Sequence, residues 1–345
     1  MKKIILGLLV LVVAAGATAM LWFNNQIGDT GVHKEPVVFE VPPGTTINGM
    51  AEMLEEEELI RNALAFKVYA RIQNFSNLQA GHYQIKPGMD MRAIASTIFS
   101  GDVIFPDTIT VTFPEGKTLD DMAAILAEKT SHTQEEILAV WDGEDFIQSA
   151  IDNYWFITEE VLNPDLKFAL NGYLFPNTYN FENENVTPEA AAHRLLQEMD
   201  KVLTKYKDQI DSSEWTVHEI LTMASIVEYE AIFDEDRPIV AGVFYNRLEN
   251  NMRLQSCATL QMALGIHKPI YNSQDMAVNS PYNTYLVDGL PIGPGNSPGE
   301  PSIKAALNPE SHNYFYFLSD IYNDSKTYYS ETYEQHLQLQ NELLR

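Results

Sequence analysis

The most regular hydrophobic pattern in the chain predicts a helix over residues 216–231. One face of it carries apolar side chains at the i, i+3, i+4 and i+7 spacing: Val217, Ile220, Leu221 and Ala224. Thr216 precedes the pattern as an N-cap, and Glu219 follows three residues later, so the two form a capping box. Much of the remaining surface is also apolar: Met223, Ile226 and Val227. We therefore expect the helix to be buried.

Glu228 lies on this apolar face. It follows Val217 by eleven positions, so at roughly 100° per residue the two lie about 20° apart. A buried carboxyl without a charge partner has a raised pKa and stays protonated, as a general acid acting on a glycosidic oxygen must be. The alternative is a structural ion pair with Arg237 or Arg247. Glu230 points to a different side, so the two carboxylates do not form an obvious pair.

A strand, a glycine turn and a short amphipathic helix recur three times in the first part of the chain. The strands are expected at residues 37–41, 82–85 and 108–113. The turns hold Gly44, Gly88 and Gly116, and each is followed by a helix N-cap: Thr46, Asp90 and Thr118. A common capped turn can recur by chance, but three copies within about ninety residues favour a repeat.

The pattern downstream predicts a mainly helical second part. In chain order it consists of helical residues 138–207 interrupted at 171–179, the helix over 216–231, a helix over 239–250, an irregular segment over 282–301, a hairpin over 314–319 and 326–330, and a helix from Tyr333. The interruption cannot be helical because it contains Pro176.

The N-terminus carries a long apolar run. Lys2 and Lys3 precede uncharged apolar residues 4–23, and about twenty such residues make one membrane crossing. The two lysines predict a cytoplasmic N-terminus with the bulk of the chain outside, and hence a single-pass protein of the cell membrane. The alternative is a signal peptide cleaved after Ala17-Thr18-Ala19. The run continues beyond that site, so we expect an uncleaved anchor followed by a linker over residues 24–36.

Composition excludes several classes of protein. The 345 residues are enough for about two or three domains. A net charge of −26 argues against nucleic acid as a partner. Cys257 is the one cysteine, so the chain has no intrachain disulfide and no zinc site of the CxxC type. The eight histidines show no HExxH pairing, and we therefore expect neither a metal nor a cofactor.

Aromatic and amide side chains gather in the irregular segments. They are Tyr173, Phe175, Tyr179, Tyr282, Asn283, Tyr285 and Asn296. Sugars present C–H faces and hydroxyl edges, and flat apolar rings beside amide donors and acceptors suit both. A carbohydrate substrate is consistent with this mixture.

Residues 224–230 resemble the motif of the YceG-like endolytic murein transglycosylases. Further similarities lie in the family's order: residues 172–176, 243–248, 254–256, 280–285, 289–294 and 304–309, then Thr332, Glu334 and His336. The N-terminal repeats are similar to LysM-type peptidoglycan-binding modules. The chain departs from the family pattern at Asn171 and Asn177, where acidic residues are expected, and at Cys257-Ala258, where Asp-Pro is expected.

The resemblance implies an α+β fold with an N-terminal transmembrane helix, LysM-like strand-turn-helix modules and an α+β catalytic domain. The expected domains are the cytoplasmic stub and anchor over residues 1–23, the linker over 24–36, the peptidoglycan-binding region over 37–130 and the catalytic domain over 131–345.

The resemblance also implies a membrane-anchored lytic transglycosylase, a carbon–oxygen lyase that cuts nascent peptidoglycan strands internally. Glu228 would protonate the oxygen between N-acetylmuramic acid and N-acetylglucosamine. As carboxylate it would then take the proton of the C6 hydroxyl, which closes on C1 and leaves a 1,6-anhydro end. Substrate-positioning residues would be Asn246, Gln255, Tyr282, Asn283 and Asn296. The resemblance also suggests peptidoglycan synthases of the elongation or division machinery as partners.

Two alternatives remain open at this point. One is a non-catalytic anchored scaffold that binds peptidoglycan, and the missing acidic residues at positions 171 and 177 motivate it. The other is a hydrolase of the muramidase type, whose products differ from those of a transglycosylase by one water.

Overall fold

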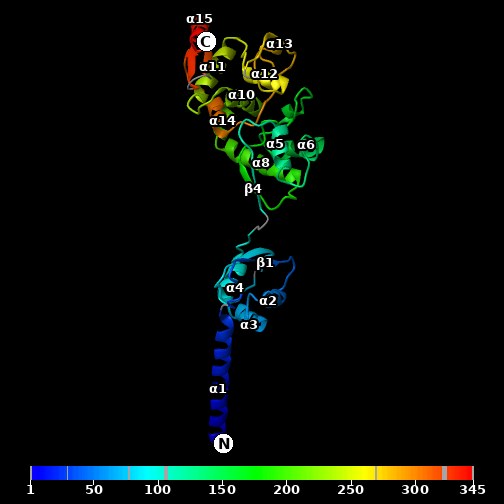
Figure 1. The fold of residues 1–345 in the computed structure, drawn as a ribbon, viewed down its shortest axis with the longest axis vertical. Coiled ribbons are helices and arrows are strands. Elements are labelled where there is room, and N and C mark those ends of the chain that lie inside the picture. Colours follow the sequence, from blue (N-terminus) through cyan, green and yellow to red (C-terminus); the bar gives the residue numbers. More distant parts are fainter. Residues whose placement is uncertain are drawn as a thin grey trace. The chain divides into compact units, whose positions relative to one another are not determined.

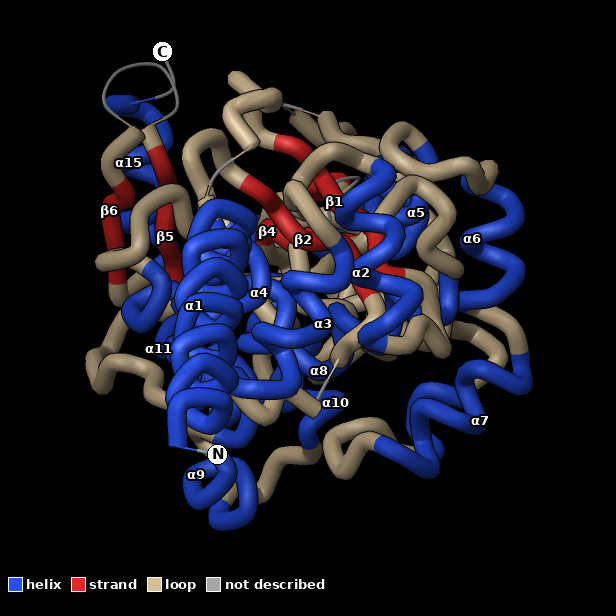
Figure 2. The backbone as a smooth tube through the Cα atoms, turned by 90° about the horizontal axis from the view of Figure 1, so that it is seen from below, coloured by secondary structure: helices blue, strands red, loops and turns tan. Residues whose placement is uncertain are grey.

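The chain forms two compact units, residues 1–108 and 109–345 (Figure 1). The computed structural model describes residues 2–28, 30–76, 78–104, 108–268, 270–320 and 325–343. Each unit has its own apolar core. In both units the strands form separate antiparallel pairs among more numerous helices (Figure 2).

The first unit combines one two-stranded sheet with short helices. Its elements are α1 (Lys2–Ile27), β1 (Val37–Val41), α2 (Ile47–Glu56), α3 (Ala63–Ile72), β2 (Gly81–Ile85) and α4 (Met91–Ser100). β1 and β2 pair with Phe39 opposite Tyr83, and both of these side chains are buried. They belong to the core that the apolar faces of α2, α3 and α4 complete.

The repeated turns share one backbone geometry. Gly44, Gly88 and Gly116 have φ angles of 83°, 80° and 74°, a region that glycine enters without steric cost. Each turn leads into the N-cap that the sequence predicts: Thr46, Asp90 and Thr118. These three predictions are confirmed, because each side chain accepts a hydrogen bond from the third backbone N–H of its helix.

The third copy of the repeat belongs to the second unit. Its strand β3 (Ile109–Thr112) pairs with β4 (Thr178–Phe181), whereas β1 pairs with β2. The LysM-like character of the repeats and the domain bounds stay predictions.

The predicted transmembrane anchor is wrong. Among the helices of the described residues, none combines the length and the apolar character that a membrane crossing requires. α1 does not end at Phe23 but continues through polar residues to Ile27, and both of these side chains pack against the core of the first unit. The Arg61 guanidinium donates a hydrogen bond to the backbone oxygen of Asn25 at 3.3 Å. The fold class that began with a transmembrane helix and the single-pass cell-membrane localisation are corrected accordingly.

The second unit is mainly helical. After β3 it contains α5 (Leu119–Ala127), α6 (Gln134–Trp141), α7 (Glu144–Asn153), the 3-10 helix η1 (Glu159–Leu162), β4, α8 (Pro188–Thr204), α9 (Lys207–Ser212), α10 (Val217–Glu230), α11 (Arg237–Glu249), α12 (Cys257–Leu264), α13 (Ser273–Met276), α14 (Glu300–Leu307), β5 (Tyr316–Ser319), β6 (Thr327–Ser330) and α15 (Tyr333–Leu343).

α10 is the most deeply buried helix of the second unit. It packs against α11, α12 and α14, and it is covered on all sides from Ile220 to Val227, as the sequence predicts. The predicted helix α11, the β5–β6 hairpin and the final helix α15 are confirmed. The sequence did not predict α12 or α14, and α14 is short and begins at the end of the Pro- and Gly-rich segment.

Candidate functional site

The last turn of α10 carries Glu228 to the point where the helix leaves the core. The predicted capping box is confirmed, since the Thr216 side chain accepts from the N–H of Glu219 and the Glu219 side chain accepts from the N–H of Thr216. The capping box fixes where the helix begins, and the burial of its middle turns fixes the rotation of the helix about its own axis. Together they set the direction in which the Glu228 side chain points. The Glu228 side chain is 7% exposed.

One carboxylate oxygen of Glu228 contacts two hydrogen-bond donors. Oε2 lies 3.2 Å from Nη1 of Arg237 and accepts a hydrogen bond of 2.9 Å from the backbone N–H of Gly299. The carboxyl is therefore held through one oxygen, and the other, Oε1, has no hydrogen-bond partner among the described residues.

Arg237 opens α11 and is itself fixed by two partners. Its Nε donates to Oδ1 of Asp234 at 2.9 Å, and its Nη1 donates to the hydroxyl of Ser302 on α14. Its side chain is 8% exposed. The expectation that Glu228 lacks a charge partner is therefore wrong. The alternative ion pair with Arg237 is present because α11 packs against α10.

A second carboxylate, Glu115, lies beside Glu228, although the sequence pattern did not predict it as a site residue. A Cβ atom built on Gly299 would overlap the Glu115 carboxylate, while the N–H of the same Gly299 bonds to Glu228. The two carboxylates therefore meet at one glycine. Burial raises the pKa of Glu115, and the negative charges of Glu228 and Asp234 raise it further, against the lowering effect of Arg237.

The turn that carries Glu115 is anchored to the segment before α14. Gly116 N–H donates to the Ser297 oxygen at 2.9 Å, and Ser297 N–H donates to the Lys117 oxygen at 2.8 Å. A signal for Glu115 was present in the sequence. The third repeat has Glu-Gly in its turn, where the first two have Pro43-Gly44 and Pro87-Gly88.

Glu230 has a different role from Glu228. It accepts hydrogen bonds from Oγ of Ser256 at 2.5 Å and from the N–H of Ala258 at 3.0 Å. It therefore provides an acceptor for a backbone N–H in the first turn of α12, which has no partner within the helix. Burial raises the pKa of Glu230, while the hydrogen bonds from Ser256 and from the backbone at Ala258 and Cys257 oppose that shift. Glu230 therefore holds α12 in place beside α10.

A cavity of about 470 Å³ lies next to this site. Its lining includes Tyr229, the chain neighbour of Glu228, together with aromatic, amide and charged side chains from other elements. These are Thr118, Asp120, Asp121, Lys167, Phe168, Asn171, Gln261, Met262, His267 and Tyr282, with backbone at Gly265 and Gly295. The mixture of rings and polar groups suits a carbohydrate.

Of the residues predicted to position the substrate, Tyr282 alone lines this cavity. Its hydroxyl accepts a hydrogen bond from the N–H of Lys167 at 3.2 Å. Gln255 accepts from Nη2 of Arg247 at 2.7 Å.

The other predicted positioning residues bond to backbone oxygens. The Asn246 amide donates to His312 and Tyr314, the Asn283 amide to Met276 and Val278, and the Asn296 amide to Ser225. Asn283 and Asn296 are fully buried. Their amides brace loops around the site, and the structure does not bring them together at Glu228.

Asn171 explains one departure from the family pattern. Its Oδ1 accepts from Leu119 N–H at 2.8 Å, and its Nδ2 donates to the Pro294 oxygen at 2.9 Å. A carboxylate could accept but could not donate, so the amide is what joins α5 to the loop before α14. Asn177 accepts a bond from the N–H of Thr178 through its side chain.

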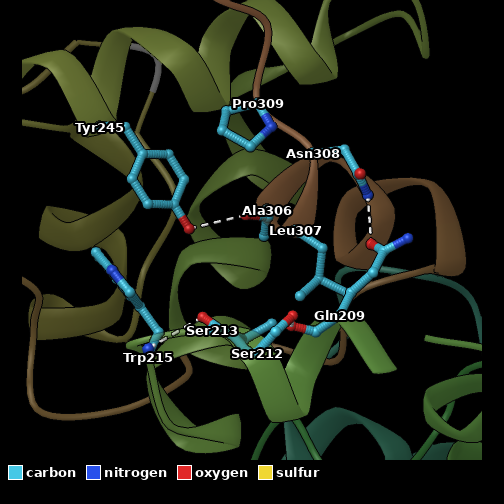
Figure 3. Close-up of a pocket in the computed structure, with 10 residues that line it drawn as sticks. Gln209, Ser212, Ser213, Trp215, Tyr245, Ala306, Leu307, Asn308 and Pro309 are labelled. Atoms are coloured by element: carbon cyan, nitrogen blue, oxygen red, sulfur yellow. Dashed lines mark hydrogen bonds between the residues drawn. The ribbon is translucent and has the colours of Figure 1, made fainter. Parts of the chain in front are cut away.

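A second hollow lies near the N-terminal end of α10. Its volume is about 330 Å³, and its wall includes Trp215, Tyr245 and Asn308 (Figure 3). Tyr245 donates to the Ala306 oxygen, and Asn308 donates to Oε1 of Gln209 (Figure 3). Among the described residues, no carboxylate or imidazole lines this hollow. Across the described ranges, no group of three or more His, Cys, Asp or Glu side chains is arranged to hold a metal ion.

Comparison with known proteins identifies relatives of this chain. Residues 39–342 match the model of the YceG-like family. The chain is 34% identical over 304 residues to the endolytic murein transglycosylase of Bacillus subtilis strain 168, covering 88% of this chain and 83% of the relative.

Two further similarities extend the comparison. The endolytic murein transglycosylase of Streptococcus pneumoniae serotype 2 is 35% identical over 318 residues, covering 88% of this chain and 57% of that longer protein. A crystal structure of a yceG-like protein from Listeria monocytogenes matches with a TM-score of 0.64 and 38% identity, covering 89% of this chain and 100% of that one.

Proposed function

This chain belongs to the YceG-like family and is a lytic transglycosylase, and we propose that it cuts peptidoglycan glycan strands internally at Glu228. The bond cut is the one between N-acetylmuramic acid and N-acetylglucosamine, and the product carries a 1,6-anhydro end. A peptidoglycan synthase as a partner stays a prediction.

The reaction moves two protons. One proton must reach the glycosidic oxygen as the bond from C1 to that oxygen breaks. Another must leave the C6 hydroxyl as its oxygen closes on C1, and the acetamido group of the sugar stabilises the positive charge that develops in between. No water is consumed. A single carboxyl can serve both steps, first as acid and then as base.

The observation that carries the proposal is the way Glu228 is held. Arg237 and the Gly299 N–H fix Oε2 at 3.2 Å and 2.9 Å, so the orientation of the carboxyl does not depend on substrate. Its Oε1 is left to exchange a proton, and the adjoining cavity begins at the next residue, Tyr229. A preorganised proton-transfer group beside a polar, ring-lined cavity is what glycosidic cleavage requires.

The test is Glu228→Gln on purified glycan strands, with product masses measured by mass spectrometry. Gln keeps the shape of the side chain but cannot exchange the proton, so we expect turnover to fall by about 10²–10⁴-fold or more while the variant stays folded. Wild-type products with anhydro ends support the proposal.

Three other outcomes would contradict it. Products heavier by one water would indicate a muramidase, and no cleavage by the wild type would indicate a binding scaffold. Retention of a tenth of wild-type turnover by Glu228→Gln would place the chemistry at another residue.

A further inference from the structure

We propose that Glu115 is a second catalytic carboxyl of this site, which protonates the glycosidic oxygen while Glu228 acts as the base. The inference rests on the proposed function and divides its two proton transfers between two residues.

The geometry provides the first argument. Glu115 stands on the glycine turn before α5, and Glu228 stands at the end of α10, yet both carboxylates touch Gly299, the N-cap of α14. The Glu115 turn is tied to the same segment through its backbone bonds to Ser297. The backbone therefore places the two side chains next to each other.

The second argument is the unequal support of the two carboxylates. Glu228 receives the Arg237 guanidinium and the Gly299 N–H on one oxygen. Glu115 has no hydrogen-bond donor or ion-pair partner within the described residues. Glu115 is therefore the carboxyl whose oxygens no donor of the described residues occupies, so it can present its proton to the glycosidic oxygen.

The charges around Glu115 agree with this assignment. Glu228 on α10 and Asp234 on the loop before α11 present negative charge, Arg237 on α11 presents positive charge, and the Tyr229 ring lies beside the neighbouring Gly116. The net effect of these groups and of burial is a raised pKa for Glu115. A raised pKa increases the fraction of Glu115 that carries a proton at a given pH, compared with an isolated glutamate.

The balanced step follows directly. The Glu115 carboxyl gives its proton to the glycosidic oxygen, and the bond from that oxygen to C1 breaks, so the leaving sugar departs as an alcohol. The C6 oxygen bonds to C1, and its proton passes to the Glu228 carboxylate. Proton transfer from Glu228 to Glu115 through solvent restores the starting state, with no redox change and no water consumed.

The experiment compares Glu115→Gln and Glu115→Asp with the wild type and with Glu235→Gln. Glu235 is an exposed glutamate between Asp234 and Asp236, with no side-chain hydrogen bond or ion pair among the described residues, and it controls for loss of one negative charge near the site. Initial rates on purified, peptide-free glycan strands are measured across pH for the full chain, with thermal unfolding as a check of folding.

We expect Glu115→Gln to lower the rate by about 10²–10⁴-fold and to abolish the fall in activity at alkaline pH. Glu115→Asp should retain that fall at an intermediate rate, because it still carries a titrating carboxyl. Glu235→Gln should match the wild type in both respects. If Glu115→Gln does not fold, the Asp variant decides alone, since an unchanged rate and profile would show that the position of this carboxyl is immaterial.

A Glu115→Gln enzyme within tenfold of the wild-type rate, or a slower one that keeps the wild-type alkaline fall, would overturn the inference. The two proposals fail separately. If Glu228→Gln is inactive while Glu115→Gln is active, the proposed role of Glu115 is wrong and that of Glu228 stands. If the wild type releases no anhydro products, the proposed function itself is wrong.

Discussion

Gly299→Ala tests the meeting of the two carboxylates without removing either of them. The backbone of Gly299 has φ −75° and ψ 167°, which alanine adopts freely. The added Cβ, however, would come within 2.8 Å of Oε2 of Glu115 and would be closer still to its Cδ and Oε1. Relief of that overlap moves the Glu115 carboxylate by about 1.5 Å, given an ordinary contact distance of about 3.5 Å.

The expected effects on rate and stability differ in size. A shift of about 1 Å in a catalytic group can lower the rate by about 10²-fold. The stability cost is small because Glu115 can turn toward solvent and the N–H of residue 299 still reaches Glu228. Replacing an N-cap glycine costs about 1 kcal/mol or less, which corresponds to a shift in Tm of about 2–4 °C for a unit of this size.

The assay measures the release of anhydro-ended fragments from glycan strands, alongside thermal unfolding. Gly49→Ala is the matched control, because its added Cβ would meet its neighbours at ordinary distances of 3.6 Å and 3.9 Å. The double variant with Glu115→Ala supplies the decisive comparison. If Gly299→Ala acts through Glu115, it should have no additional effect once that side chain is truncated. Wild-type activity in Gly299→Ala, or a full additional loss in the double variant, would refute the reasoning.

Two further predictions concern stability. Arg237→Met leaves Glu228 buried without its ion-pair partner, so it should lower the free energy of unfolding by about 3–5 kcal/mol at neutral pH. Urea denaturation measures this loss. A loss below about 1 kcal/mol would mean that the ion pair is solvated. Glu230→Gln should change how stability depends on pH. The folded-state pKa of Glu230 is raised by burial, so its contribution is present below the unfolded pKa and is lost as pH rises through the folded value. Chemical denaturation at several pH values should show this decline in the wild type and a flatter curve in the variant, and parallel curves would contradict the shift.

Local features of this chain were predictable from the sequence. The caps at Thr46, Asp90, Thr118 and Thr216 were found because a cap depends on groups within about four residues of each other. The burial of α10 was found for a similar reason, since helical periodicity puts its apolar residues on defined faces. The terminal hairpin was marked by its aromatic-rich strands. By contrast, α12 is held in place by Glu230 from another element, which no local pattern around residue 257 reports.

The N-terminal run shows where a local pattern misleads. Hydrophobicity over residues 4–23 satisfied the length of a membrane crossing, but the pattern contains nothing about what the end of the helix packs against. In the structure the helix extends to Ile27, and its last turn joins the core of the first unit. Tertiary contacts, and not the length of the apolar run, define that end of the helix.

By itself the sequence determined that a carboxyl would stand at the end of a buried helix, because the eleven-residue spacing from Val217 to Glu228 fixes their common face. Only the tertiary structure decided what that carboxyl meets. Arg237 reaches it because α11 packs on α10, and Glu115 reaches it because its turn is bonded to the segment before α14. Side-chain direction follows from a helical period of a few residues. The partners of a charge instead depend on contacts between elements far apart in the chain, which the packing of the whole core fixes together.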